Sequence, residues 1–252
     1  MEFEFSILLL LLLTGLVAGF IDAIAGGGGL IALPVLLACG LNPVEALATN
    51  KLQGSFGTFS AARYFVRKKI VDLKQMRLTI LCTFIGSVCG TLLIQQLDSS
   101  FLAILMPLLL ISIAIYFLFS PQISDEDTHA RIKATTFGFL IGTSIGFYDG
   151  FFGPGTGTFF TLAYVALAGY SIIKATAHTK VLNFTSNIAS LIFFAIGGHI
   201  VWIAGLIMAT GQLIGGRLGA ALVINKGSRL IKPLIVSMTL LLSAKLLIEQ
   251  FS

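Results

Sequence analysis

The sequence predicts an all-α polytopic membrane protein with about 8–10 transmembrane segments, in two inverted repeats with glycine-broken helices. The first observation is composition, because 56% of the 252 residues are hydrophobic and 11% are charged. A soluble domain has about 25% charged residues. The mean hydropathy is +0.98. The other two observations are a glycine-rich stretch that carries an acid and occurs twice, and a repeat that covers nearly the whole chain.

The first half begins with apolar runs that are long enough to cross a bilayer, which takes about 20 apolar residues per helix. Since Met1-Glu2-Phe3-Glu4 lacks the basic region of a signal peptide, we expect the first run to be retained. A short apolar piece and a helix to about Phe65 separate it from the later runs. The long runs are Phe5–Ala25, Leu78–Leu97 and Phe101–Phe119, and the short piece is Leu30–Cys39.

A glycine break ends the first apolar run. Gly19-Phe20-Ile21-Asp22 leads into Gly26–Gly29, and four glycines in a row cost about 1 kcal/mol each against alanine inside a helix. The pattern returns as Gly146-Phe147-Tyr148-Asp149, followed by Gly153, Pro154, Gly155, Thr156 and Gly157. The two copies are separated by 127 residues. The sequence therefore predicts two intramembrane helix breaks, each with an acid beside it.

The rest of the chain repeats as well, at a separation of 129 residues after a two-residue insertion. Ala48-Thr49-Asn50-Lys51 then corresponds to Ala177-His178-Thr179-Lys180, and Gly86 and Gly90 correspond to Gly215 and Gly219. Each half is thus one structural unit. The expected organisation is an N-terminal repeat over residues 1–120, a polar connector over 121–133 and a C-terminal repeat over 134–252.

Charge indicates the relative orientation of the halves. The basic loop Arg67–Lys74 corresponds to 195–201, which carries only His199. The turn 95–100 lacks a basic residue, whereas its counterpart 224–229 carries Lys226 and Arg229. Because basic loops face the cytoplasm, the halves are expected to be inverted, with five crossings each and both chain ends outside. The alternative is a parallel pair of four spans each.

Four ionisable residues lie inside apolar segments: Asp22, Lys51, Asp149 and Lys180. Burying a charge at mid-membrane costs about 2.5–3.5 kcal/mol, so these residues are functional candidates. Each acid and each lysine has a counterpart in the other half. The structural alternative is that Asp22–Lys51 and Asp149–Lys180 are ion pairs within the halves that only hold helices together.

Polar residues at helical spacing accompany the lysines. Thr176, Lys180, Asn183, Asn187 and Ser190 form one stripe, and Lys51, Gly54 and Thr58 share the corresponding face. Such a stripe faces protein or a wet cavity. Where a helix restarts after a glycine break, its free amides and positive dipole suit an anion. The expected substrate-binding residues are Gly26, Gly27, Gly28, Gly29, Asn50, Lys51, Gln53, Gly153, Gly155, Gly157, Thr179, Lys180, Asn183 and Asn187.

Three residues are candidates for ion pairing or proton transfer: Asp22, Asp149 and His178. His178 is interpreted either as a hydrogen-bonded histidine near a helix end or as a proton-coupling group. We expect no metal and no cofactor, because Cys39, Cys82 and Cys89 lack metal-ligand spacing. We expect no nucleic-acid partner either, because the net charge of +5 comes from short loops between apolar runs.

Two other functions are alternatives to a transporter. Gly142-Thr143-Ser144-Ile145-Gly146 matches G-x-S-x-G and resembles the nucleophile site of a rhomboid-type intramembrane serine hydrolase, with His178 or His199 as base. Against this, the two glycines correspond to Gly15 and Gly19 of the first half, and Ser144 corresponds to Val17. A passive anion channel is the second alternative.

Gly-Phe-x-Asp followed by a glycine break, with Pro34 and Ala-Thr-Asn-Lys downstream, resembles the TauE/SafE family of sulfite-exporter-like permeases. The resemblance covers essentially the whole chain, although Pro154 and Thr156 interrupt the glycines of the second copy. It implies transport of a small anion, often a sulfur-containing one such as sulfite, a sulfonate or a sulfoacetate-like compound.

The sequence contains no G-x-x-x-x-G-K-[ST] motif, so a gradient or a partner is expected to supply the energy. The protein is therefore expected to be a secondary transporter that works in the lipid bilayer as a multi-pass cell-membrane protein, in the inner membrane if it is bacterial. A homodimer is one option for its assembly.

Overall fold

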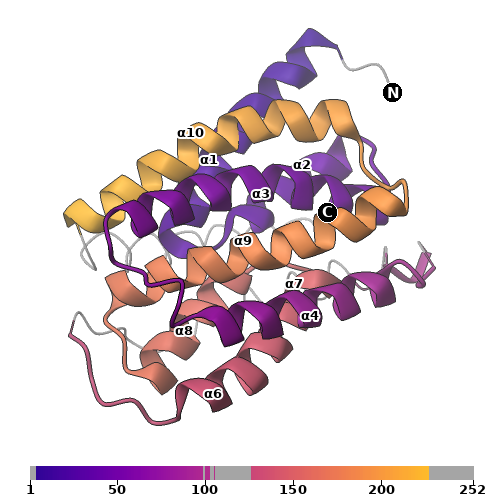
Figure 1. Cartoon of the computed structure of the whole chain (residues 1–252). Coiled ribbons are helices and arrows are strands. Elements are labelled where there is room, and N and C mark those ends of the chain that lie inside the picture. The colour runs from indigo at the N-terminus through magenta and orange to yellow at the C-terminus, as the bar shows by residue number, and fades with distance from the viewer. Residues whose placement is uncertain (1–3, 99, 103–104, 106–125, 227–252) are drawn as a thin grey trace, which may run out of the picture.

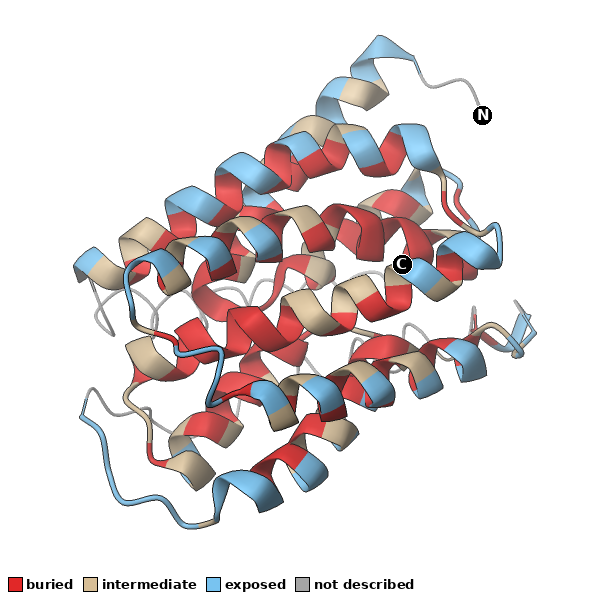
Figure 2. Cartoon of the chain, in the orientation of Figure 1, coloured by how far each residue is buried: buried red, intermediate tan, exposed pale blue. Residues whose placement is uncertain are grey.

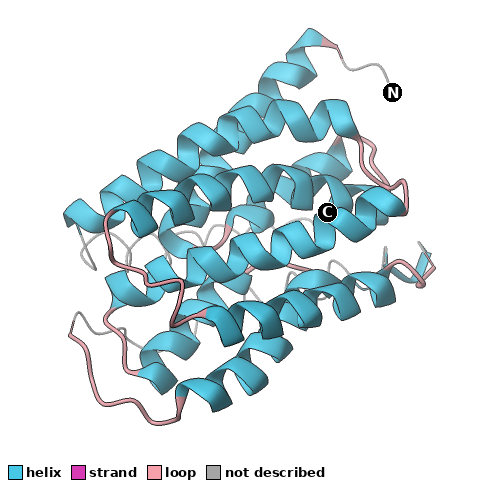
Figure 3. Cartoon of the chain, in the orientation of Figure 1, coloured by secondary structure: helices cyan, strands magenta, loops and turns pink. Residues whose placement is uncertain are grey.

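The computed structural model describes residues 4–98, 100–102, 105 and 126–226. Within these ranges the regular elements are helices, and no strand occurs among them (Figure 3), which confirms the predicted all-α class. The first-half helices are α1 Phe5–Ala25, α2 Gly28–Ala38, α3 Pro43–Arg67 and α4 Arg77–Ile94. The second half has α6 Ala134–Thr136, a π-helical segment η1 Phe137–Gly142, α7 Thr143–Phe151, α8 Thr156–Ala168, α9 Ile172–Ile196 and α10 Trp202–Lys226.

Glycines let pairs of long helices approach closely. On α1, a Cβ at Gly15 would lie 2.2 Å from the carbonyl oxygen of Met208 on α10. On α7, a Cβ at Gly150 would lie 2.0 Å from the carbonyl oxygen of Ser87 on α4. Small residues are what allows membrane helices to pack backbone against backbone. The fold therefore rests on two tight helix pairs, α1 with α10 and α4 with α7.

The order of contacts along each pair fixes the helix directions. Gly15 and Gly19 of α1 lie against Met208 and Gln212 of α10, so these two helices run the same way. Figure 1 shows that α3 runs with α1 and α10, whereas α4 and α9 run in the opposite direction. Gly146 and Gly150 of α7 lie against Thr83 and Ser87, so α7 runs with α4.

The two predicted helix breaks are confirmed. Gly26 ends α1 with a φ of +81°, and Gly153 follows α7 with a φ of +101°. Side chains disfavour this left-handed region, which explains the glycines. A Cβ at Gly26 would lie 2.5 Å from the Cα of Gly157, so the two breaks cross in direct contact. The short helices α2 and α8 restart beyond the breaks.

The surface and interior follow the pattern of a membrane protein (Figure 2). Large apolar side chains are exposed along α1 and α10, including Leu13, Val17 and Ile214, whereas Thr, Ser and Asn side chains are buried between helices. Lipid accepts the apolar exterior, and polar groups are satisfied internally. By length and composition, α1, α4, α9 and residues 202–225 of α10 are apolar enough to span.

Several predicted segments lie partly or wholly outside the described residues. The run Phe101–Phe119 is described only at 101, 102 and 105, and the chain beyond 226 is not described. The connector is described over 126–133, where it has no helix and lies beside the turn between α8 and α9. There the Thr128 amide donates to the carbonyl oxygen of Gly169 at 2.7 Å. The number of crossings per half stays a prediction.

Basic side chains gather at one end of the helix bundle. Arg217 of α10 and Lys68 after α3 both lie over the ring of Tyr64, at 5.7 and 5.8 Å. Lys174 at the start of α9 pairs with Asp127 of the connector at 3.1 Å. At the opposite end, a Cβ at Gly197 would lie 2.2 Å from the side-chain oxygen of Gln95. Lys51 and Lys180, by contrast, are buried inside the bundle.

Candidate functional site

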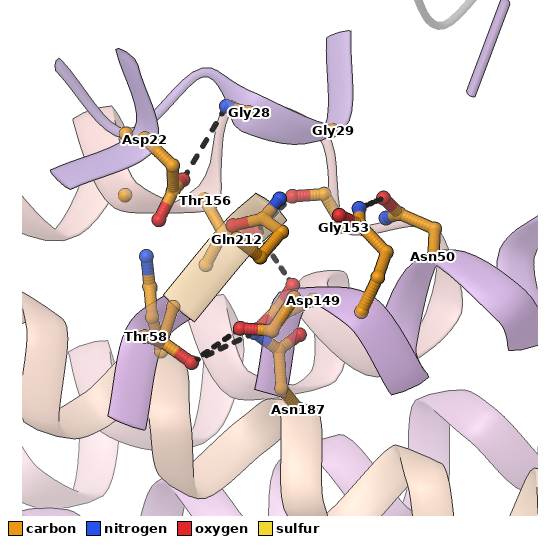
Figure 4. A pocket seen from close by; sticks show the side chains of 16 residues that line it. Asp22, Gly28, Gly29, Asn50, Thr58, Asp149, Gly153, Thr156, Asn187 and Gln212 are labelled. Atoms are coloured by element: carbon orange, nitrogen blue, oxygen red, sulfur yellow. Dashed lines mark hydrogen bonds between the residues drawn. The ribbon is translucent and has the colours of Figure 1, made fainter. Parts of the chain in front are cut away.

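A small polar cavity of about 40 Å³ lies where the two breaks cross (Figure 4). Both breaks line it, together with residues of α3, α9 and α10. Because one buried water needs roughly 10–15 Å³ of such space, the cavity accepts a few waters or a small ion. Its lining residues are Asp22, Gly26, Gly28, Gly29, Asn50, Gln53, Gly54, Thr58, Asp149, Gly153, Gly155, Thr156, Gly157, Asn183, Asn187 and Gln212.

Two carboxamides in this wall are buried and incompletely paired. The Gln53 side chain donates to the Asn50 side-chain oxygen at 2.6 Å, but its own oxygen has no partner among the described residues. The side-chain oxygen of Asn183 is likewise without a partner there. Gln53 is 1% exposed and Asn183 is 4% exposed. A buried polar atom left unpaired costs about 1–3 kcal/mol. Both unpaired atoms are oxygens and accept hydrogen bonds, so they suit a donor such as water, and each side chain offers its NH₂ group to an anion when the carboxamide is rotated.

Two helix N-termini reach the same cavity. Gly28 and Gly29 begin α2, and Gly155 precedes α8 with a φ of +83°. The first amides of a helix have no partner inside the helix, and the dipole makes this end positive. One of these amides is already used, because Gly28 donates to the Asp22 carboxylate at 3.3 Å. Three more are used within the breaks, because the amides of Leu30, Thr156 and Thr158 donate to the carbonyl oxygens of Gly27, Gly153 and Gly155 at 3.1, 3.1 and 2.9 Å. The first-turn amides that remain are those of Gly29 and Gly157.

The four buried charges pair across the two halves. The Lys51 ammonium on α3 lies 2.7 Å from the Asp149 carboxylate, and the Lys180 ammonium on α9 lies 3.1 Å from the Asp22 carboxylate. Each lysine also donates to the main-chain oxygen of the same aspartate. The predicted pairs Asp22–Lys51 and Asp149–Lys180 are therefore wrong. The reason is the crossing of the breaks, which brings each aspartate to the lysine of the other half.

Not every predicted site residue reaches the cavity wall. The two lysines are 1% exposed and lie behind the aspartates, so they do not line the cavity. Gly27 does not line it, and Thr179 faces Thr161, whose hydroxyl donates to it at 3.1 Å. The ten other predicted substrate-binding residues line it, as do Asp22 and Asp149: Gly26, Gly28, Gly29, Asn50, Gln53, Gly153, Gly155, Gly157, Asn183 and Asn187.

Four lining residues were not among the predicted site residues of either kind. Gly54 and Thr58 share the helix face of Lys51, and Thr156 belongs to the second break, so sequence spacing already pointed to them. The sequence pointed less clearly to Gln212, because it is a single carboxamide side chain inside an apolar run. Its side chain fills the space beside two glycines: a Cβ at Gly57 would lie 2.0 Å from the Gln212 side-chain oxygen, and one at Gly19 would lie 2.6 Å from it.

His178 lies at a second cavity, of about 130 Å³, near the basic end of the bundle. One ring nitrogen is 2.7 Å from the carbonyl oxygen of Lys174, one turn earlier on α9. The ring packs against Tyr164 and Tyr170, at centroid distances of 5.5 and 4.9 Å. The structure therefore places His178 apart from the cavity at the breaks, in a hydrogen-bonded position near the start of α9.

Ser144 is exposed on α7, while the glycines on either side of it in the motif are buried against α4. A Cβ at Gly146 would lie 2.5 Å from the carbonyl oxygen of Thr83. The two glycines therefore have a packing role that needs no serine chemistry, in agreement with their counterparts in the first half.

Comparison with known proteins agrees with this geometry. The model of the family described as sulfite exporter TauE/SafE matches residues 11–246. The chain belongs to this family. It is 47% identical over 239 residues to "Probable membrane transporter protein YfcA" of Escherichia coli K12, covering 95% of this chain and 89% of that protein. It is also 47% identical over 250 residues to "Probable membrane transporter protein" of Haemophilus influenzae, covering 99% and 98%. No solved structure matches the chain.

As a TauE/SafE family member, the protein is a multi-pass membrane transporter rather than an enzyme. It moves a small-molecule substrate and works in a lipid environment. The hydrolase interpretation of Ser144 is thereby overturned. The matched residues 11–246 include both Gly-Phe-x-Asp motifs and their glycine breaks.

Proposed function

We propose that this TauE/SafE protein is a secondary transporter of a small, sulfur-containing anion, and that its site is the cavity between the two glycine breaks. The family description, which names sulfite, supports the sulfur-containing class. The observation that carries the proposal is the convergence of two helix N-termini and several carboxamides on one small buried cavity. Donors of this kind bind oxyanions without requiring a fixed positive charge in the wall.

The balance of charge supports an anion of low charge. Two lysines and two aspartates at the cavity sum to zero, so the empty site is electrically neutral. The lysines lie directly behind the aspartates and favour negative charge in the cavity once an aspartate is neutralised or moves away. The cavity volume of about 40 Å³ suits an ion as small as sulfite or a short sulfonate.

We further propose that the halves 1–120 and 134–252 are inverted repeats. Counterpart contacts support this: Gly90 lies against the carbonyl oxygen of Phe147, as Gly219 lies against that of Phe20. The helices α1, α3 and α4 run opposite to their counterparts α7, α9 and α10 (Figure 1). In an inverted pair, rocking of one half against the other exposes a central site to each side in turn.

Counterflow tests the transport proposal. Purified protein in liposomes loaded with unlabelled anion should take up the same labelled anion from outside, with sulfite, methanesulfonate, sulfoacetate, sulfate and acetate compared. A carrier exchanges labelled for unlabelled substrate without net current. Voltage-driven currents without counterflow would make the protein a channel, and absence of both for every anion would contradict the anion proposal.

One substitution tests the location of the site and the sign of the substrate charge. Asn187→Asp keeps the side-chain size and places a negative charge at the cavity wall, so anion affinity should fall about ten- to a hundredfold, or about 1.4–2.8 kcal/mol. Asn225→Asp is the matched control, because Asn225 is exposed near the end of α10. Equal affinity in the two variants would place the site elsewhere or make the substrate uncharged.

A further inference from the structure

The two crossed ion pairs differ in how completely the carboxylate is bonded. The Asp149 carboxylate accepts from the Lys51 ammonium at 2.7 Å, from the Thr156 hydroxyl at 3.0 Å and from the Ser186 hydroxyl. The Asp22 carboxylate accepts from the Lys180 ammonium at 3.1 Å and from the Gly28 amide at 3.3 Å. The Asp22 side chain is 16% exposed against 5% for Asp149. Asp149 is thus enclosed by donors, whereas Asp22 is open to the cavity.

The sequence explains this difference, because glycine replaces the hydroxyl residues in the first half. Ser186 corresponds to Gly57 at the separation of 129, and Thr156 corresponds to a glycine at either separation, Gly29 or Gly27. Hydroxyl residues are likewise replaced by glycine or alanine at the neighbouring helix interfaces. Ser87, Thr91 and Ser190 form a buried hydroxyl cluster between α4 and α9, and their counterparts between α3 and α10 are Gly216, Ala220 and Ala61.

We propose that Asp22 takes up and releases a coupling proton during transport, whereas Asp149 stays ionised as a fixed partner of Lys51. This inference rests on the proposed function, since it names the ion that accompanies the anion. Three side-chain donors surround the Asp149 carboxylate and leave a proton little access to its oxygens. The Asp22 carboxylate has one side-chain donor and faces the cavity, so it is the one that a proton reaches and neutralises at lower cost.

The proton step changes one contact. When the Asp22 carboxylate gains a proton, its ion pair with Lys180 is lost, while the Lys180 ammonium keeps its hydrogen bond to the Asp22 main-chain oxygen. Lys180 is then an unpaired positive charge beside the cavity, and a monovalent anion restores neutrality. One proton and one monovalent anion therefore enter the neutral site together. Each favours binding of the other, by the five- to 150-fold that is typical of coupled sites, about 1–3 kcal/mol.

The charged groups that face Asp22 are consistent with this proton step. From α9 the facing group is Lys180, and across the cavity stand Asp149 of α7 and Lys51 of α3, which neutralise each other. From α10 the neutral Gln212 lines the cavity, and α2 contributes only backbone amides there. His178 lies at the other cavity and takes no part.

Infrared difference spectroscopy tests the proton site without any substrate. Spectra of the purified protein between neutral and acidic pH report the carbonyl band of a protonated carboxylic acid inside the protein. The band should persist in Asp149→Asn and disappear in Asp22→Asn. If Asp149→Asn does not fold, Ser186→Ala replaces it, and in that variant the Asp22 band should remain. Loss of the band in Asp149→Asn with retention in Asp22→Asn would overturn the assignment.

Transport measurements separate this inference from the proposed function. Labelled methanesulfonate is a suitable probe, because it keeps its charge at every pH used. In Asp22→Asn, an inward proton gradient should no longer drive methanesulfonate accumulation, and the counterflow that remains should not depend on pH. Two results would overturn the inference but not the anion transporter, provided that the wild type shows counterflow. One is accumulation driven by a sodium gradient in the wild type, and the other is unchanged proton-driven accumulation in Asp22→Asn. Loss of counterflow in the wild type would overturn the proposed function, while the infrared result would still decide which carboxylate titrates.

Discussion

Lys51 of the first half forms its ion pair with Asp149 of the second half, 98 positions along the chain, rather than with Asp22. The counterpart pair joins Lys180 of the second half to Asp22 of the first half. Both pairs bridge the halves exactly where the glycine breaks cross. The four buried charges therefore lie at the interface between the two halves.

A double-mutant comparison tests the crossed pairing. Lys51→Met leaves Asp149 as an unpaired buried charge, and removing one partner of a buried pair typically destabilises by about 3–5 kcal/mol. Adding Asp149→Asn should restore most of the loss in thermal stability, measured in detergent. Adding Asp22→Asn instead should deepen it, because that change leaves Lys180 unpaired as well. Rescue by Asp22→Asn and not by Asp149→Asn would mean that the pairs form within each half.

The helix breaks were predictable from the sequence because their cause is local. Gly26 and Gly153 take left-handed backbone angles that other residues disfavour, and this requirement is visible in a run of glycines without knowledge of the rest of the fold. The same holds for the polar face that carries Asn183 and Asn187. Helical spacing alone puts these two side chains on one side, and that side faces the cavity.

The partner of each lysine was not predictable, because it depends on how two distant segments cross. Sequence spacing places Lys51 and Asp149 on elements of different halves and gives no information on their separation. The crossing of Gly26 against Gly157 decides it. Gln212 is a similar case: its position at the cavity follows from the packing of α10 against Gly19 and Gly57. Only the assembled bundle reveals either relationship.

Two neighbouring glycines provide a matched test of the first break. Gly26→Ala forces a side chain into the left-handed region, which costs roughly 1–2 kcal/mol, and its Cβ would also overlap the backbone of Gly157 at 2.4 Å. Gly27 has a φ of −110°, and a Cβ there would meet only a Leu30 methyl at 3.7 Å. Gly26→Ala should therefore lower both thermal stability and counterflow, while Gly27→Ala should leave both nearly unchanged. Equal effects of the two changes would contradict this account of the break.

The G-x-S-x-G motif on α7 gives a second pair of contrasting variants. Ser144→Ala should leave counterflow and thermal stability within experimental error of the wild type, because Ser144 is exposed and Val17 occupies the counterpart position. Gly146→Ala should be harmful, since its Cβ would lie 2.5 Å from the carbonyl oxygen of Thr83 on α4. Labelling of wild-type Ser144 by a fluorophosphonate would contradict the packing role of the motif.

The gathering of basic residues at one end of the bundle predicts the orientation in the membrane. Lys68 and Lys226 lie at that end, and the positive-inside rule places it in the cytoplasm. Asp98 and His199 lie at the other end, after α4 and α9.

Single cysteines at these four positions, in a chain with the three native cysteines replaced, should react with a membrane-impermeant maleimide from opposite sides. Lys68→Cys is preferred to a change at Lys69, because Lys69 has a φ of +59°. Labelling of Lys68→Cys and His199→Cys from the same side would mean that the two halves are parallel, and the inverted-repeat proposal would then fail.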